Sequence, residues 1–362
     1  MAFYIFISLF SLVVLLIIHE LGHFVLAKKF GVKVEEFGLG YPPRLFGKKI
    51  GETLYSLNLL PFGAFVKIYG EEERSDDSRS FNTKPIWQRA LIISGGVMSF
   101  WIASAIILSF VMMLGAPVAI DDEEIHNLKD PKVQIISVSS DSPAGIAEIR
   151  AGDVIKQIII NDQELTINKV KEVQEITDSH KGEEIILTIE RGPEVFDVTL
   201  VPRISPPAGE GAMGIGLTRT ATKFYPWYKA PVEGILETFN LTLAITKGLA
   251  GMAGSIISGK GMPSGVQIAG PIGIFGLFTQ MAQLGFSYFL RFIAVISIYL
   301  AVFNILPIPA LDGGKLLFLL IEKIKGSPVN EKLEQSIHLS FFVLLILLMV
   351  FVTIKFDIPR VF

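Results

Sequence analysis

The chain has 362 residues, 51% of them hydrophobic, and a mean hydropathy of +0.53. This composition indicates an integral membrane protein and gives room for two or three structural units. The formal net charge of −3 argues against a nucleic-acid partner. Because the chain contains no cysteine, disulfides and thiolate metal sites are excluded.

The first apolar stretch, residues 3–27, is long enough to cross a bilayer as one helix. Lysines occupy positions 28, 29 and 33, and no Lys or Arg precedes them. The positive-inside rule therefore predicts an outer N-terminus and a cytoplasmic end near Lys28. A cleaved signal peptide is the alternative. It is disfavoured because the stretch has no basic start and carries a polar motif where cleavage would occur.

That motif is His19-Glu20-Leu21-Gly22-His23, which has the pattern H-E-x-x-H. Residues four apart share one face of a helix, so both imidazoles can bind one zinc ion, and Glu20 beside them can accept a proton from water. Polar residues without a role are the less favoured explanation, because ionisable groups at membrane depth are costly. Soluble zinc proteases share the pattern, and zinc needs a third ligand from elsewhere.

Residues 34–70 contain six glycines and two runs of strand-forming residues, 53–57 and 64–69. We expect a small antiparallel sheet or hairpin on the cytoplasmic side that dips toward the membrane, with an ordinary loop as the alternative. Residues 90–116 form a second span that returns the chain to the outer side. Residues 1–120 would then be the first half of a membrane core.

Residues 121–205 are soluble in composition, with predicted strands at 133–138, 184–190 and 195–201. The runs Ser142-Pro143-Ala144-Gly145-Ile146-Ala147 and Ala151-Gly152-Asp153-Val154-Ile155 resemble a bacterial, circularly permuted PDZ domain. Such an α+β domain binds extended peptide ends by adding a strand.

Residues 206–287 are predicted to be a linker. The part at 232–257 is apolar but carries Glu233, Glu237 and Lys247, which favours an interfacial amphipathic helix. The part at 266–286 is rich in glycine and favours a re-entrant or surface segment. A pair of spans is the alternative, whereas a single crossing would separate the two halves of the metal site.

Residues 288–306 and 337–354 form the third and fourth spans, so that 288–362 is the second half of the core. Pro307 and Pro309 interrupt the helix at membrane depth, which requires a polar or protein-lined surrounding. Asp312 lies in this interruption and is the best candidate for the third metal ligand. The alternative is that Asp312 caps the next helix or pairs with Lys315.

With these residues in view, the chain resembles the site-2 protease family of intramembrane zinc metalloproteases, in particular the bacterial regulator-of-sigma-E protease subgroup. The matching pieces are the histidine motif, the PDZ signature, Gly270-Pro271-Ile272-Gly273-Ile274 and the run from Asn304 to Gly314.

The resemblance implies that His19, His23 and Asp312 bind Zn²⁺, that Glu20 is the general acid and base, and that Asn304 contacts the substrate. It also implies that a strand near residues 62–70 pairs with an unwound substrate helix; the strand residues in question are Phe65, Val66, Lys67 and Ile68.

Two departures from the family stand out: one PDZ domain instead of two, and Gly95-Gly96-Val97-Met98-Ser99 where Gly-Pro-x-x-Asn is usual.

We therefore predict a polytopic α-helical membrane protein with four transmembrane helices, a small membrane-associated β-sheet and one PDZ domain between helices two and three. Both termini and the PDZ domain would lie outside a bacterial cytoplasmic membrane. The predicted partners are membrane-spanning proteins already trimmed by another protease, peptide termini and lipid.

The predicted function is regulated intramembrane proteolysis, for example of an anti-sigma factor or remnant signal peptides. A catalytically silent PDZ scaffold is one alternative, but it would not need Glu20. A transporter with broken helices is another, but the chain has no internal repeat.

Overall fold

The computed structural model describes the whole chain except residues 1, 72, 74, 124–128, 140, 208, 260, 262–267 and 362. Within the described residues, four helices are long and apolar enough to cross a membrane, which agrees with the predicted number of spans. They are α1 (Ala2–Lys29), α2 (Ile86–Leu114), α7 (Phe286–Ile305) and α9 (Glu331–Val352), the last continued to Asp357 by a π-helical turn.

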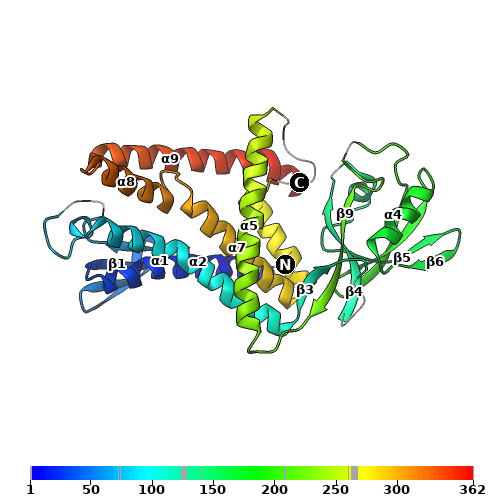
Figure 1. Cartoon of the computed structure of the whole chain (residues 1–362), viewed down its shortest axis with the longest axis horizontal. Helices are drawn as coiled ribbons and strands as arrows, with labels where there is room; N and C mark the ends of the chain where they lie inside the picture. Colours follow the sequence, from blue (N-terminus) through cyan, green and yellow to red (C-terminus); the bar gives the residue numbers. More distant parts are fainter. Residues whose placement is uncertain are drawn as a thin grey trace.

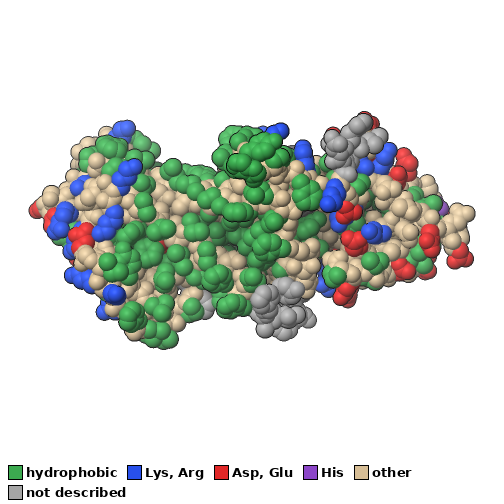
Figure 2. Space-filling model, turned by 90° about the horizontal axis from the view of Figure 1, so that it is seen from below, with side chains coloured by type: hydrophobic (Ala, Val, Ile, Leu, Met, Phe, Trp, Pro, Cys, Tyr) green, Lys and Arg blue, Asp and Glu red, His purple; other side chains and the backbone are tan. Residues whose placement is uncertain are grey.

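Hydrophobic side chains cover the middle of the molecule, and charged side chains gather toward its two ends (Figure 2). A strand pair, β1 and β2, lies at one end of α1 and α2, and a larger sheet lies at the other end (Figure 1). An apolar band between two charged ends is what a bilayer-spanning protein requires.

Two glycines bring α1 and α2 into backbone contact. A Cβ atom on Gly22 would lie 2.2 Å from the carbonyl oxygen of Gly95, and one on Gly95 would lie 2.7 Å from that of Gly22. Small residues allow such close approach of membrane helices. The crossing point therefore falls inside the histidine motif of α1, and α2 forms a wall of the site.

The smaller sheet consists of β1 (Val34–Ile50) and β2 (Thr53–Ile68), and each strand folds back on itself. Residues 34–39 pair on one side with residues 54–57 and on the other with residues 64–68, while residues 44–50 pair with residues 53–58. The small antiparallel sheet predicted from the sequence is present. Residues 64–68, hereafter the edge segment, form one edge of it within the described part of the chain.

A unit of strands and helices, hereafter the inserted unit, separates α2 from the rest of the membrane core. Its strands follow the order β3-β9-β4-β5-β7-β8, with β6 paired to β5. The elements are β3 (Ala116–Ile120), β4 (Lys129–Val138), α3 (Pro143–Ile146), β5 (Val154–Ile160), β6 (Gln163–Thr166), α4 (Val170–Ser179), β7 (Ile185–Arg191), β8 (Glu194–Leu200) and β9 (Ile215–Lys223).

The predicted end of this unit at residue 205 is wrong, because β9 pairs with both β3 and β4 inside the sheet. Residues 215–223 therefore belong to the unit and not to the linker. The composition changes at 205, but the strand that completes the sheet follows a Pro- and Gly-rich turn. Strands predicted at 184–190 and 195–201 correspond to β7 and β8 within one residue.

The segment after β9 contains α5 (Ala230–Ile257) and α6 (Pro271–Leu284). Neither is among the four candidate spans of the described chain, and α5 runs across α2 and α7 instead of along them (Figure 1). Gly234 of α5 lies against Ser109 and Ala105 of α2. At its far end, α6 meets the inserted unit, where Gln280 donates from Nε2 to the carbonyl of Ala151 at 2.6 Å.

The break after α7 leads into α8 (Asp312–Lys325), which packs against α2. A Cβ on Gly313 would lie 2.0 Å from the carbonyl oxygen of Leu306, and one on Gly314 would lie 2.5 Å from that of Ile308. Only glycine allows the start of α8 to pack so tightly against the interrupted chain. This packing fixes Asp312, the first residue of α8.

Candidate metal centre and active site

The structure brings together the three side chains predicted as metal ligands, from the two ends of the chain. His19 and His23 lie on the inner face of α1, and their Nε2 atoms are 3.3 Å apart. Oδ2 of Asp312 lies 3.4 Å from each of these nitrogens. All three residues are at most 9% exposed. Within the described residues they form a group of His and carboxylate side chains that could hold a metal ion.

The two imidazoles are held in place from behind. Nδ1 of His23 lies 2.9 Å from the carbonyl oxygen of Ile92. Because a carbonyl oxygen can only accept, Nδ1 of His23 carries the proton. Nε2 of the same ring then has a free lone pair that faces His19 and Asp312. The ring of His19 stacks on Phe100 with centroids 4.6 Å apart. Phe100 is itself fixed, because Ser297 of α7 donates to its carbonyl at 2.7 Å. Contacts from α2 and α7 therefore surround the two imidazoles of α1.

This geometry fits a zinc ion. Zinc in proteins is tetrahedral, with bonds of about 2.0–2.1 Å to nitrogen and oxygen, which places neighbouring ligand atoms about 3.3–3.4 Å apart. The three donor atoms have that spacing. Oδ2 of Asp312 is buried and has no hydrogen-bond partner among the described residues. A buried carboxylate oxygen facing two imidazole nitrogens needs a cation or proton between them.

Glu20 is half-buried on α1, between the two histidines in sequence. Its carboxylate is close enough to interact electrostatically with His23, Asp312 and Lys315. Glu20 therefore borders the centre without being one of the three convergent donors, which is the position expected for a proton acceptor.

Gly96 on α2 makes room for the two imidazoles. A Cβ atom at this position would lie 2.2 Å from Nε2 of His23 and 2.6 Å from Cε1 of His19. The sequence identified Gly96 as part of a departure from the family pattern. Its specific role was not predicted, since it depends on where α1 and α2 cross.

His338 supports the break that carries Asp312. The N–H of Ala310, whose φ of 85° is unusual for a residue with a side chain, donates to Nδ1 of His338 at 3.0 Å. His338 lies near the start of α9, so this bond ties the fourth span to the interruption. Sequence periodicity gave no sign of it, because the two residues are 28 positions apart.

The residues predicted to bind substrate lie on two elements. Phe65, Val66, Lys67 and Ile68 belong to the edge segment and pair with residues 34–38 on one side. Asn304 lies in the last turn of α7, half-buried, and its amide donates to the carbonyl of Leu300 at 2.9 Å. Asn304 is therefore close to the helix break, with its Nδ2 engaged within its own helix.

Comparisons with known proteins agree with this site. The model of peptidase family M50 matches residues 7–348. A protein of Clostridium perfringens named as a zinc metalloprotease is 35% identical over 97% of this chain and 98% of its own length. The zinc metalloprotease RasP of Oceanobacillus iheyensis is 28% identical over 96% of this chain and 97% of its own.

Among solved structures, the PDZ domain of an SdrC-like protein from Listeria monocytogenes is 22% identical, covers 26% of this chain and 92% of its own, and has a TM-score of 0.21. The family match spans nearly the whole chain, including both α1 and the fourth span. The chain belongs to peptidase family M50, the site-2 protease family that its motifs predicted.

Proposed function

We propose that the protein is a membrane-embedded zinc metalloprotease that cleaves single-span membrane proteins within or next to the bilayer. The observation that carries the proposal is the convergence of His19, His23 and Asp312, from an apolar helix and a helix break, at the spacing of zinc ligands. The relatives' names as zinc metalloproteases support Zn²⁺ as the cofactor.

In this proposal His19, His23 and Asp312 hold the zinc ion, and Glu20 moves the protons. Zinc, when bound, supplies a Lewis acid that activates water and polarises the peptide carbonyl. Glu20 accepts the proton of the attacking water and donates it to the leaving amine. The carbonyl of Ile92 keeps His23 in the tautomer that presents Nε2 to the metal.

A helical substrate shields its peptide bonds with its own hydrogen bonds, so it must unwind before cleavage. The edge segment offers backbone groups to an extended chain, and pairing by Phe65, Val66, Lys67 and Ile68 would replace part of the lost bonding. Asn304 would add a side-chain hydrogen bond near the helix break. Proline at Phe65, Val66 or Lys67 removes one backbone donor each, and alternate residues of the edge face opposite sides, so cleavage should fall in an every-other-residue pattern. Equal tolerance of proline at all three positions would contradict strand pairing.

The substrates of the proposal are proteins that another protease has already trimmed, such as an anti-sigma factor or a remnant signal peptide. Peptide termini would bind the inserted unit as they bind PDZ domains, by strand addition. The sequence runs Ser142–Ala147 and Ala151–Ile155 support that assignment.

We further propose that both termini and the inserted unit lie outside the cytoplasmic membrane, and that α5 and α6 do not cross it. The lysines after α1 and in α8 support a cytoplasmic position for the sheet end. Because the chain has no native cysteine, a maleimide that cannot cross membranes should label Ser205→Cys in intact cells and Ser327→Cys only after permeabilisation. The opposite pattern would refute this orientation.

Cleavage by the purified protein in lipid vesicles tests the function. A single-span substrate with a tag at each end should give two fragments whose new termini, located by mass spectrometry, fall within or next to the span. A zinc chelator should abolish the cleavage, and added zinc should restore it. Cleavage that survives complete removal of zinc, or that occurs only far from the membrane, would contradict the proposal.

A further inference from the structure

An ion pair joins the end of the edge segment to the helix that carries Asp312. Nζ of Lys315 donates to Oε1 of Glu71, across 244 positions of sequence. Lys315 lies one turn after Asp312 in α8, and Glu71 lies three residues after the edge segment. The pair therefore connects the two parts of the molecule that would align a substrate with the metal.

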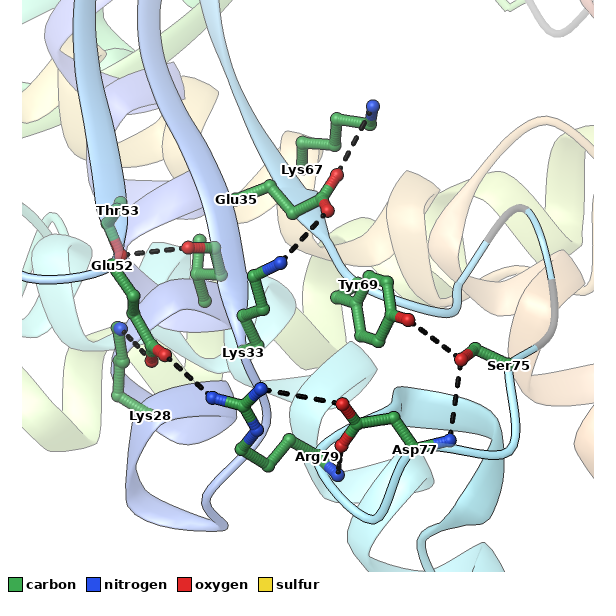
Figure 3. Close-up of polar contacts among 11 residues, drawn as sticks. Lys28, Lys33, Glu35, Glu52, Thr53, Lys67, Tyr69, Ser75, Asp77 and Arg79 are labelled. Atoms are coloured by element: carbon green, nitrogen blue, oxygen red, sulfur yellow. Dashed lines mark hydrogen bonds and ion pairs between the residues drawn. The ribbon is translucent and has the colours of Figure 1, made fainter. Parts of the chain in front are cut away.

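On the sheet side, Glu71 directly follows a closely packed turn at Gly70. Gly70 has a φ of 77°, and a Cβ atom there would lie 1.6 Å from Oγ of Ser80. The N–H of Tyr69 donates to Lys33, and the carbonyl of Tyr69 accepts from Phe81 at 2.8 Å. Next to this turn, the hydroxyl of Tyr69 lies 2.7 Å from that of Ser75, and Nζ of Lys67 lies 3.3 Å from Oε2 of Glu35 (Figure 3). A displacement of Glu71 would therefore move the edge segment with it.

On the other side, α8 is held both by apolar packing, with Leu319 buried against Ile92 and Ile93 of α2, and by ion pairs. A cavity of about 490 Å³ lies beside the pair and is lined by both Glu71 and Lys315. A second ion pair, Arg89 with Glu322, lines the same cavity and ties α8 to the start of α2. The two ion pairs lie on the face of α8 that borders the cavity, so they add to the packing that places this helix.

Lys315 stays charged in this surrounding. The carboxylates of Glu71 and Asp312 lie near its ammonium group and hold the pKa of Lys315 above its ordinary value. The Glu71 side chain is 16% exposed and that of Lys315 is 40% exposed. Ion pairs this close to water add little to the free energy of unfolding. The role of the Glu71–Lys315 pair is therefore to be sought in the position of the two elements that it joins.

We propose that Glu71 and Lys315 are positioning residues, which fix the edge segment relative to Asp312 so that a paired substrate meets the metal in register. The inference rests on the proposed function of the edge segment. A misplacement of about 1 Å can cost about 100-fold in rate. Losing the pair should therefore impair turnover of bound substrate more than its binding.

The test combines Glu71→Gln, Lys315→Gln and the double variant, assayed in vesicles with a single-span substrate. Each single change should lower kcat by about 10- to 100-fold, with KM altered less than about threefold and one zinc ion per chain retained. The double variant should be no worse than either single one, since both remove the same contact. Lys315→Arg should restore most of the rate.

The matched control is Glu52→Gln in the turn between β1 and β2. Glu52 pairs with Lys28 of α1 at 2.8 Å and with Arg79 at 3.4 Å, and neither partner belongs to the edge segment or to α8 (Figure 3). It should leave kcat within about twofold. Three results would overturn the proposal. They are a fall in kcat of the double variant that equals the product of the two single effects, a loss of zinc from any of these variants, and an equal fall in kcat of the control.

A second readout needs no cleavage. Spin labels on cysteines at the exposed positions Lys67 and Lys323 report the distance between the edge segment and α8. Glu71→Gln and Lys315→Gln should broaden this distance distribution, whereas Glu52→Gln should not. An unchanged distribution would overturn the positioning role even if the protein cleaves, and a broadened one would support it even if the proposed strand pairing fails.

Discussion

Glu20→Gln should lower the rate of cleavage by about 10²- to 10⁴-fold while the protein keeps one zinc ion per chain. Proton transfer by a positioned carboxylate contributes about that much to an enzymatic rate. Gln has nearly the same shape but cannot accept the proton of the attacking water. The three convergent donors, His19, His23 and Asp312, are untouched by the change.

His23→Ala should behave differently, with loss of both zinc and cleavage. The change removes one of three donor atoms and also the ring that is fixed by the carbonyl of Ile92. Zinc per chain, measured by elemental mass spectrometry, and cleavage in vesicles separate the two variants. His180→Ala is the matched histidine control, because His180 lies at the end of α4 in the inserted unit, and it should retain zinc and full activity.

Rapid cleavage by Glu20→Gln would rule out Glu20 as the proton carrier. Retention of tightly bound zinc by His23→Ala would rule out the proposed ligand set. The two results are independent, so the acid–base role and the metal site can fail separately.

The parts of the site that could be predicted from the sequence are those that depend on local sequence patterns. The spacing of His19 and His23 on one helix face depends on 3.6 residues per turn, so it needs no knowledge of the fold. Asp312 was found through the prolines that interrupt α7, which is also a local signal. That these residues meet was inferred from the need of zinc for a third ligand, and the parity of the spans was deduced from that meeting. The structure brings their donor atoms together.

Contacts between residues far apart in the sequence could not be predicted from such local patterns. The position of β9 between β3 and β4 depends on pairing across about 90 residues, and the turn-rich segment before it was taken as a linker. The edge segment was predicted as a strand, but its place at the sheet edge depends on how β1 and β2 fold back on themselves. Register of this kind is set by tertiary packing more than by strand propensity.

The support of the site was also invisible in the sequence. His338 near the start of α9 accepts from Ala310, and Lys315 pairs with Glu71 from the far half of the chain. Each of these residues has an ordinary local surrounding. Their roles appear once the helix break, the sheet and the fourth span are brought side by side.

Gly96 is the clearest example of a residue whose role could not be predicted from the sequence, because its role depends on having no Cβ atom. The Cβ of an alanine would lie 2.2 Å from Nε2 of His23 and 2.6 Å from Cε1 of His19, closer than side-chain carbons ever approach such atoms. Both rings would have to turn or α2 would have to shift. His23 would then lose its bond to Ile92, and the spacing of the ligand atoms would no longer fit zinc.

Gly96→Ala should therefore reduce zinc affinity and lower cleavage by at least about 100-fold, the cost of about 1 Å of misplacement at a reacting centre. Gly248→Ala is the matched control, since it makes the same change in the long helix α5, where a Cβ would meet nothing within 4 Å. It should leave zinc and cleavage unchanged. Zinc titration and the vesicle assay compare the zinc affinity and the cleavage rate of the two variants. Circular dichroism verifies that both variants fold. Full zinc binding and cleavage by Gly96→Ala would mean that α2 can shift to accommodate the methyl group. The absence of a side chain at residue 96 would then not be required for the position of the two histidines.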